Sequence, residues 1–251
     1  MFFFGVLSGR ELERYDRQLR VPEIGVDGQV RLKRSTVLVV GVGGLGGVAA
    51  MYLAAAGVGR IRLVEDGVLE LSNLNRQLPY SEHDLGCSKV DLAARRLRSI
   101  NSEIVVEALQ LRLSVDNVSE LLKDVDVVVD GLDNFETRFL LNEACVQAGV
   151  PFVHAAVYGF EGRLMTIIPG KGPCLRCLIP QTPTVEEVIP VVGPVPGAIG
   201  SLEALETIKI MTGAGKPLVG KLLVFNGLNL EFFLLPVAKS PKCPVCSSRK
   251  T

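Results

Sequence analysis

Short apolar runs alternate with amphipathic stretches along the first two thirds of the chain. Apolar runs, several of them rich in β-branched residues, predict strands over residues 36–40, 60–65, 104–108, 125–129 and 152–156. The stretches between them predict helices over residues 45–56, 88–100, 115–122 and 136–148. Strands that alternate with helices in this way form a mainly parallel sheet with helices on both faces. The pattern therefore predicts an α/β fold.

Both flanks depart from this alternation. Residues 11–34 are charged and helix-favouring, and they predict an N-terminal helical arm. Residues 159–166 are hairpin-like, and residues 169–196 are rich in proline and apolar residues, which favours a crossover loop. Beyond that loop, residues 202–211 predict a helix, and residues 221–235 predict a terminal hairpin that turns at its Asn-Gly pair.

Composition narrows the class of protein. Of the 251 residues, 48% are hydrophobic, which suits one large domain with a buried core. The 27 basic residues balance the 27 acidic ones, so the protein has no net positive charge that would attract nucleic acid or an anionic membrane. The apolar stretches are interrupted well short of the roughly 20 residues that span a bilayer. The first seven residues are apolar but lack the basic region and cleavage site of a secretion signal. We expect a cytoplasmic protein that binds neither nucleic acid nor membranes.

A glycine-rich segment stands where a phosphate-binding turn belongs. It directly follows the first predicted strand, opens a helix, and contains Gly41, Gly43, Gly44 and Gly46. Glu65, at the end of the next predicted strand, suits a ribose hydroxyl. Dinucleotide-binding and adenylating enzymes share such a turn, and it also occurs as a packing turn without a ligand.

Three downstream positions separate these interpretations. Arg76 and Lys89 can neutralise phosphate charge, and Asp133, just after an apolar strand, can hold Mg²⁺. A nicotinamide enzyme needs no such set. The alternative, which is the weaker explanation for each residue taken singly, treats Arg76 and Lys89 as solvated surface charges and Asp133 as a helix N-cap. Their joint occurrence favours an ATP site.

Four of the six cysteines form two C-x-x-C pairs, Cys174 with Cys177 and Cys243 with Cys246. Two such turns can close a tetrahedral Zn²⁺ site of four thiolates with no open position. Disulfides and a catalytic metal are the alternatives, and a reducing compartment favours structural zinc. The site would fasten the C-terminal tail to the body of the protein.

The ordered set of motifs resembles the MoeB/ThiF/HesA group of E1-like adenylating enzymes. The shared parts are residues 14–18, the glycine turn, residues 72–77, Lys89, residues 131–134 and both cysteine pairs. The resemblance implies a Rossmann-like core that uses ATP to adenylate the C-terminal carboxylate of a ubiquitin-like sulfur-carrier protein ending in Gly-Gly. No general base is needed, because that carboxylate is already ionised at pH 7.

The resemblance also implies roles for individual residues. Besides the glycines, it implies that ATP is bound by Glu65, Asp66, Asn73, Arg76, Lys89, Asp133 and Asn134. Asp133 would hold Mg²⁺, and in a homodimer Arg17 would reach into the partner's ATP site. The chain is then one adenylation domain with three parts. These are a helical arm (1–34), an ATP-binding core (35–168), and a part with the crossover loop, zinc knuckle and hairpin (169–251).

Two features depart from the family's pattern. Members usually carry an Asp-x-Asp pair after the second strand, whereas this chain has Glu65 and Asp66, either of which suits the ribose. Members that link covalently to their carrier have a cysteine in the crossover loop, where residues 189–193 here are Ile, Pro, Val, Val and Gly. We therefore expect adenylation without a thioester, with Cys87, near a helix start, as the competing nucleophile.

Three other functions remain open. An E1-like tRNA threonylcarbamoyladenosine dehydratase would be expected to carry a basic RNA-binding extension, which the balanced charge disfavours. An NAD-dependent oxidoreductase explains the glycine turn but neither the two cations nor the cysteines. A non-catalytic dimeric scaffold has no use for a full set of phosphate-binding residues. His154, on a predicted buried strand, favours a structural role. The sequence does not identify the carrier, the sulfur donor, or a molybdopterin, thiamine or other product.

Overall fold

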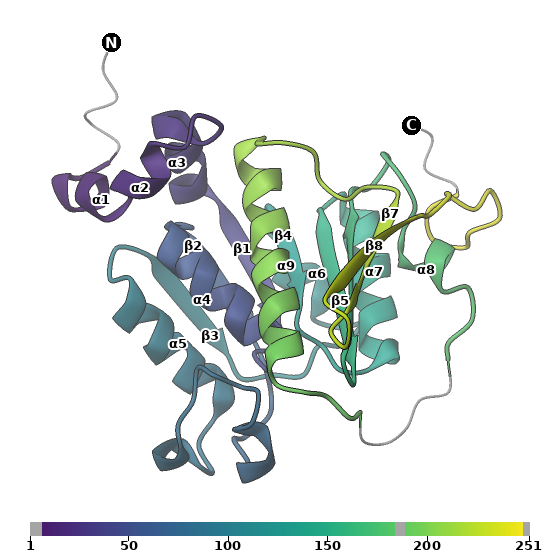
Figure 1. Cartoon of the computed structure of the whole chain (residues 1–251), viewed down its shortest axis with the longest axis horizontal. Coiled ribbons are helices and arrows are strands. Elements are labelled where there is room, and N and C mark those ends of the chain that lie inside the picture. Colours follow the sequence, from purple (N-terminus) through teal and green to yellow (C-terminus); the bar gives the residue numbers. More distant parts are fainter. Residues whose placement is uncertain (1–6, 184–188, 248–251) are drawn as a thin grey trace.

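A computed structural model of the chain describes residues 7–183 and 189–247 (Figure 1). Its strands are β1 (Thr36–Val40), β2 (Arg60–Val64), β3 (Val105–Leu109), β4 (Val127–Asp130), β5 (Phe152–Tyr158), β6 (Glu161–Ile167), β7 (Lys221–Asn226) and β8 (Glu231–Pro236). They form one sheet in the order β3-β2-β1-β4-β5-β6-β7-β8. The first five strands in this order pair in parallel, and the last three join antiparallel. The predicted mainly parallel α/β sheet is confirmed.

Helices cover both faces of the sheet. One face carries α4 (Gly46–Ala56), α5 (Lys89–Ile100) and α9 (Pro194–Thr212), and the other carries α6 (Val118–Leu121), α7 (Phe135–Ala148) and α8 (Leu175–Leu178). Within β1, Val37 and Val39 pack toward the first face, while Leu38 and Val40 pack toward the second. Every residue of β1 is buried, which explains why its sequence is continuously apolar rather than alternating.

The N-terminal arm consists of α1 (Gly9–Arg14), α2 (Asp16–Leu19) and α3 (Gly25–Arg34), grouped at one end of the sheet in Figure 1. The Tyr15 hydroxyl accepts a hydrogen bond of 2.8 Å from Asn101, and Gln18 donates one of 3.0 Å to the Ala56 carbonyl. Ala56 and Asn101 lie at the C-terminal ends of α4 and α5. The arm therefore packs where these two helices end, far from the glycine turn where α4 begins.

The structure corrects two predicted boundaries. Helix α9 begins at Pro194, inside the stretch expected to be a crossover loop up to residue 196, because a proline in the first turn of a helix has no hydrogen bond to lose. The β7–β8 hairpin turns over residues 227–230 rather than at its Asn-Gly pair. Gly227 donates its N–H to the Phe160 carbonyl at 2.8 Å and lacks the positive φ that a two-residue turn requires. Residues 184–188 of the crossover lie outside the described residues.

Within the described residues, no helix is long and apolar enough to cross a membrane. Two single-turn helices that the sequence pattern did not predict, η1 (Leu71–Asn73) and η2 (Glu82–Asp84), lie between β2 and α5. The connection that contains them brings part of the motif at residues 72–77 close to the glycine turn.

Helix α9 carries a buried carboxyl group. Glu203 is 0% exposed, and neither of its carboxyl oxygens has a hydrogen-bond partner among the described residues. Burial and the charge of Asp130 raise the pKa of Glu203 well above its usual value, against the opposing effect of Arg138. Burial therefore favours the protonated, neutral form of this side chain in the folded protein.

We expect Glu203→Gln to raise the melting temperature near pH 8 and to change it less near pH 5. Below the unfolded-state pKa of about 4.3, glutamate is protonated in both states. As the pH rises above that value, only the unfolded state ionises, so the wild type loses stability that the glutamine variant keeps. Thermal unfolding followed by circular dichroism measures the melting temperatures of the variant and the wild type. For a chain of this size, a change of about 1 kcal/mol in the free energy of unfolding shifts the melting temperature by about 2–4 °C.

The matched control is Glu206→Gln on the same helix. Glu206 is also buried, but its carboxylate accepts hydrogen bonds from Thr166 at 2.5 Å and from the Leu218 N–H at 2.7 Å. We expect this variant to melt at a lower temperature than the wild type near pH 8. If the Glu203→Gln difference does not change with pH, Glu203 is not held neutral by the fold.

Candidate active site

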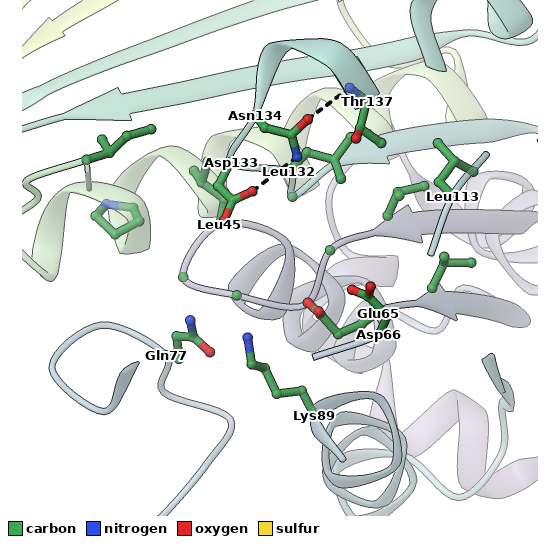
Figure 2. Close-up of a pocket in the computed structure, with 18 of the residues that line it drawn as sticks. Leu45, Glu65, Asp66, Gln77, Lys89, Leu113, Leu132, Asp133, Asn134 and Thr137 are labelled. Carbon is green, nitrogen blue, oxygen red and sulfur yellow. Dashed lines mark hydrogen bonds between the residues drawn. The ribbon is translucent and has the colours of Figure 1, made fainter. Parts of the chain in front are cut away.

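A cavity of about 780 Å³ opens at the C-terminal ends of β1, β2 and β4 (Figure 2). The chain leaves β1 toward β2 and β3 on one side and reaches β4 and β5 on the other, so the cavity lies at the switch point where α/β sheets bind ligands. Most residues predicted for ATP binding line it: Gly41, Gly43, Gly44, Glu65, Asp66, Arg76, Lys89, Asp133 and Asn134. The fold thus brings distant motifs together.

The glycine turn at the base of the cavity tolerates no side chains at its tightest points. Gly41 has φ +84°, and a Cβ there would lie 2.5 Å from the Gly131 carbonyl oxygen. A Cβ on Gly46 would lie 2.0 Å from the Gly41 carbonyl oxygen. Gly46 does not line the cavity, so its role is close packing between the turn and α4, whereas Gly43 and Gly44 face the ligand space.

Two side chains hold the turn from opposite sides. The Tyr80 hydroxyl donates a 2.7 Å hydrogen bond to the Val42 carbonyl, and burial raises the pKa of Tyr80, so it remains a donor. Glu65 accepts from the Val42 N–H at 3.2 Å and, through its other oxygen, from the Gly67 N–H at 2.9 Å. Glu65 is therefore fixed by the backbone at the cavity edge. Asp66, beside it in Figure 2, is exposed and makes no side-chain hydrogen bond with any described residue.

Cationic and amide groups approach the turn from the loop after β2 and from the start of α5. Figure 2 shows Lys89 and Gln77 pointing toward the glycine turn. Lys89 forms no ion pair with any described residue. Arg76 uses Nη1 to donate to the Ser72 carbonyl and to Asn75 Oδ1, both at 2.9 Å. These bonds orient the guanidinium and leave Nη2 and Nε available for an anion.

Asn73 does not line the cavity. It is 8% exposed, and its Oδ1 accepts from the Glu70 N–H at 3.2 Å, which closes η1. Its position supports the loop that carries Arg76 and Gln77.

The loop after β4 presents a carboxylate to the cavity. Asn134 caps α7 by accepting from the Thr137 N–H at 2.9 Å, and its Nδ2 donates to Asp133 Oδ1 at 3.3 Å (Figure 2). The N-cap alternative for Asp133 is therefore wrong, because the cap is the next residue. Asp133 is exposed, and it lies across the cavity from the residues that follow β2.

Comparison with known proteins decides the family. The sequence model of the ThiF family matches residues 15–245. The chain belongs to the ThiF family.

Two curated relatives match this ThiF-family chain over nearly their whole length. It is 44% identical to the sulfur carrier protein adenylyltransferase of Thermus thermophilus, over 96% of this chain and 93% of that protein. It is 43% identical to the SAMP-activating enzyme E1 of Haloferax volcanii, over 96% of this chain and 90% of that protein. Among solved structures, E. coli MccB with ATP superposes with a TM-score of 0.83 at 26% identity, covering 94% of this chain and 75% of MccB.

The ThiF-family finger residue predicted from the sequence, Arg17, is exposed on α2 and does not line this chain's cavity. The arm that carries it contacts the C-terminal ends of α4 and α5, whereas both helices begin at the cavity. Helix α4 has 11 residues, a length of about 16 Å, so Arg17 lies at the far end from its own glycine turn.

The four cysteines of the C-x-x-C pairs come together as predicted. Their sulfur atoms all lie within 4.8 Å of one another, with Cys174 to Cys243 at 3.5 Å and Cys177 to Cys246 at 3.4 Å. These separations are far longer than a disulfide bond of about 2.05 Å. They are close to the roughly 3.8 Å between thiolates that each lie about 2.3 Å from a tetrahedral Zn²⁺. The cluster joins the C-terminal segment to the β6–α9 connection.

Sequence reasoning missed several residues of the cavity. Gln77 is 5% exposed, lines the cavity, and its Oε1 has no partner among the described residues. Its place at the end of the motif at residues 72–77 was a signal that could have found it. Arg112 and Leu113 also line the cavity, but they follow a short strand in a segment without a motif. Val191 and Pro196 form an apolar wall from the crossover and the start of α9.

Proposed function

We propose that this ThiF-family chain is an adenylyltransferase that uses ATP to activate the C-terminal carboxylate of a ubiquitin-like sulfur-carrier protein ending in Gly-Gly. The observation that carries the proposal is the convergence of Arg76, Lys89 and Asp133 on the glycine turn at the switch point of the sheet. The names of the Thermus and Haloferax relatives support an adenylating reaction and a small protein substrate.

The cavity suits a nucleoside triphosphate. Backbone N–H groups of the glycine turn, at the start of α4, would bind phosphate oxygens, with Arg76 and Lys89 adding charge. Glu65 would accept from the ribose hydroxyls through the lone pairs that its two backbone hydrogen bonds leave free, with Asp66 beside it as the alternative. Leu111 and Leu113 offer apolar contact to a base at the edge of the same cavity.

Asp133 and the cations have complementary roles in the reaction. A carboxylate oxygen of the carrier attacks the α-phosphorus of ATP, a new P–O bond forms, and the bond to the β-phosphate oxygen breaks, which releases pyrophosphate. No proton is transferred, so the protein's contribution is to orient the reactants, neutralise charge and exclude water. Asp133 offers an exposed oxygen ligand suited to Mg²⁺, which would neutralise the departing pyrophosphate.

A homodimer completes the proposed site. Arg17 lies too far from its own glycine turn to serve it. A second copy, packed so that its helical arm lies over the cavity, would bring the partner's Arg17 to the triphosphate. The arm that carries Arg17 is anchored to α4 and α5 by Tyr15 and Gln18, so it would present the guanidinium from a fixed base.

The cysteine cluster would hold a structural Zn²⁺. We expect about one Zn²⁺ per chain, and removal by a strong chelator should lower the melting temperature by about 10 °C or more without changing ATP affinity. Atomic absorption, thermal unfolding and calorimetric ATP titration measure the three quantities. Cys246→Ser should lose the metal, and Cys87→Ser, at an exposed cysteine outside the cluster, should keep it. Disulfides found by mass spectrometry under non-reducing conditions would contradict this assignment.

The proposed function is tested by ATP–pyrophosphate exchange with a panel of purified Gly-Gly-ended carriers from the same organism. Exchange that depends on one carrier and on its terminal carboxylate supports the proposal and identifies the substrate. Exchange that depends on tRNA instead would favour the dehydratase alternative. Binding of NAD in place of ATP would favour the oxidoreductase. We also propose a cytoplasmic location, where thiolates stay reduced for zinc.

A further inference from the structure

A cluster of charged and polar side chains is buried beside the loop that carries Asp133. It consists of Asp130 at the end of β4, Arg138 on α7, His154 on β5 and Glu203 on α9. Each of these residues is 5% exposed or less, and none of them lines the cavity. Four elements therefore converge on groups that the proposed chemistry does not use directly.

Asp130 is the centre of this cluster. Its Oδ1 accepts from the Leu132 N–H at 3.0 Å, and its Oδ2 lies 2.6 Å from His154 Nδ1 and 3.2 Å from Arg138 Nε. Burial lowers the pKa of His154 against the opposing charge of Asp130, so a neutral imidazole donates its Nδ1 hydrogen to the carboxylate. The carboxyl group of Asp130 thus lies between the His154 imidazole and the Arg138 guanidinium.

Arg138 binds the backbone carbonyl of Leu132, the residue whose N–H donates to Asp130. Its Nη2 donates to the Leu132 carbonyl, and also to the Ala155 carbonyl at 3.1 Å. The N–H of Leu132 is thus held by Asp130 and its carbonyl by Arg138. Leu132 directly precedes Asp133, so the two buried charges fix the backbone from which the cavity carboxylate projects.

The same loop is packed tightly against the phosphate-binding turn. A Cβ on Gly131 would lie 2.1 Å from the Gly41 carbonyl oxygen, so the two backbones are in direct contact. A shift of the Leu132 backbone would therefore change the position of Asp133 relative to the glycine turn, as well as the local conformation of the loop.

We propose that Arg138 is a positioning residue that holds the Leu132 carbonyl and thereby sets the Asp133 carboxylate where it can bind the metal of a metal–ATP complex. This inference rests on the proposed role of Asp133. Arg138 itself does not line the cavity. Lysine cannot replace it, because one ammonium lacks the planar guanidinium that donates to the Leu132 and Ala155 carbonyls while its charge lies beside Asp130.

The test is Arg138→Lys, with equilibrium binding as the readout. We expect affinity for ATP measured with Mg²⁺ to fall about 10- to 100-fold, the range found when groups that orient metal ligands are removed. Affinity for ATP in EDTA should change by less than about twofold. Isothermal titration calorimetry gives both values. An Arg138→Lys protein that binds ATP with Mg²⁺ as the wild type does, or that loses both affinities equally, overturns the proposal.

Arg98→Lys is the matched control. Arg98 also extends from a helix to donate to a strand carbonyl, that of Val106 at 2.6 Å, but it lies near the end of α5 away from the cavity. Both ATP affinities should stay within about twofold of the wild type. A loss specific to Mg²⁺ in this variant would mean that any weakened arginine produces the effect, and would overturn the proposal.

Asp130→Asn and amide hydrogen exchange keep the test decisive if Arg138→Lys folds poorly. Asparagine preserves the shape of Asp130 but removes the charge opposite Arg138, so a smaller Mg²⁺-specific loss is expected. Without nucleotide, amide hydrogen exchange at residues 131–134 should be about 10-fold faster or more than in the wild type, in whichever of Arg138→Lys and Asp130→Asn folds. The reason is that each variant weakens a hydrogen bond that holds the Leu132 backbone. Unchanged exchange overturns the inference. If the wild type binds no ATP, the proposed function fails, and the exchange result alone still decides whether Arg138 fixes the loop.

Discussion

Replacing Asp133 with alanine should abolish Mg²⁺-dependent ATP–pyrophosphate exchange while leaving the fold intact. Asp133 is exposed, and its one side-chain hydrogen bond among the described residues is the 3.3 Å contact from Asn134, so its loss removes little stability. A metal held against transferring phosphates is worth several kcal/mol, so losing its ligand should slow exchange by about 10³-fold or more. Exchange is followed with labelled pyrophosphate and a saturating carrier.

Asp116→Ala provides the matched control for this prediction. Asp116 is also exposed but does not line the cavity, and we expect exchange to remain within about twofold of the wild type. The melting temperatures of both variants should lie close to that of the wild type. Exchange by Asp133→Ala at the wild-type rate would remove Asp133 from the reaction.

Arg17→Ala should inactivate the enzyme as severely, and mixing it with Asp133→Ala should restore part of the activity. In a symmetric dimer with a trans-acting arginine, a hybrid has one site with its own Asp133 and the partner's Arg17, while its other site lacks both. After re-equilibration of equal amounts, half of the dimers are hybrids. About one quarter of all sites should then be active, which pyrophosphate exchange measures directly.

The two possible arrangements of Arg17 give opposite results in this experiment. If Arg17 acted within its own chain, every chain in the mixture would lack either Arg17 or Asp133, and no activity would return. Each variant re-equilibrated alone is the control and should stay inactive. Recovery that is absent after subunit exchange, itself verified by mixing tagged and untagged chains, would exclude the trans arrangement.

The chemical motifs were predictable because each is confined to a short stretch of chain. The glycine turn depends on a strand, four glycines and a helix start within a few residues. Each cysteine pair is likewise a local turn, and the four sulfur atoms lie within 4.8 Å of one another, as four ligands of one metal site should. The mainly parallel sheet follows from the alternation of apolar runs and amphipathic stretches.

Functional assignments to single residues within a motif were less reliable. Asn73 and Gln77 belong to the same segment, yet Asn73 closes a turn and Gln77 lines the cavity with an oxygen that has no partner among the described residues. The two amides look alike in the sequence. Which of them faces the cavity depends on the direction in which the single turn η1 runs, and that direction is not written in the residue types.

The sequence by itself determined the fold class, the glycine turn, the cations and carboxylate that line the same cavity, and the four cysteines, because these depend on local backbone geometry and on the chemistry of residue types. Only the tertiary structure decided which residues support them. Asp130, Arg138 and Glu203 lie on three different elements, and nothing in their spacing indicates that they share one buried cluster. Their pairing depends on long-range packing. Burial in that packing raises the pKa of Glu203 and places Arg138 where it donates to the Leu132 carbonyl.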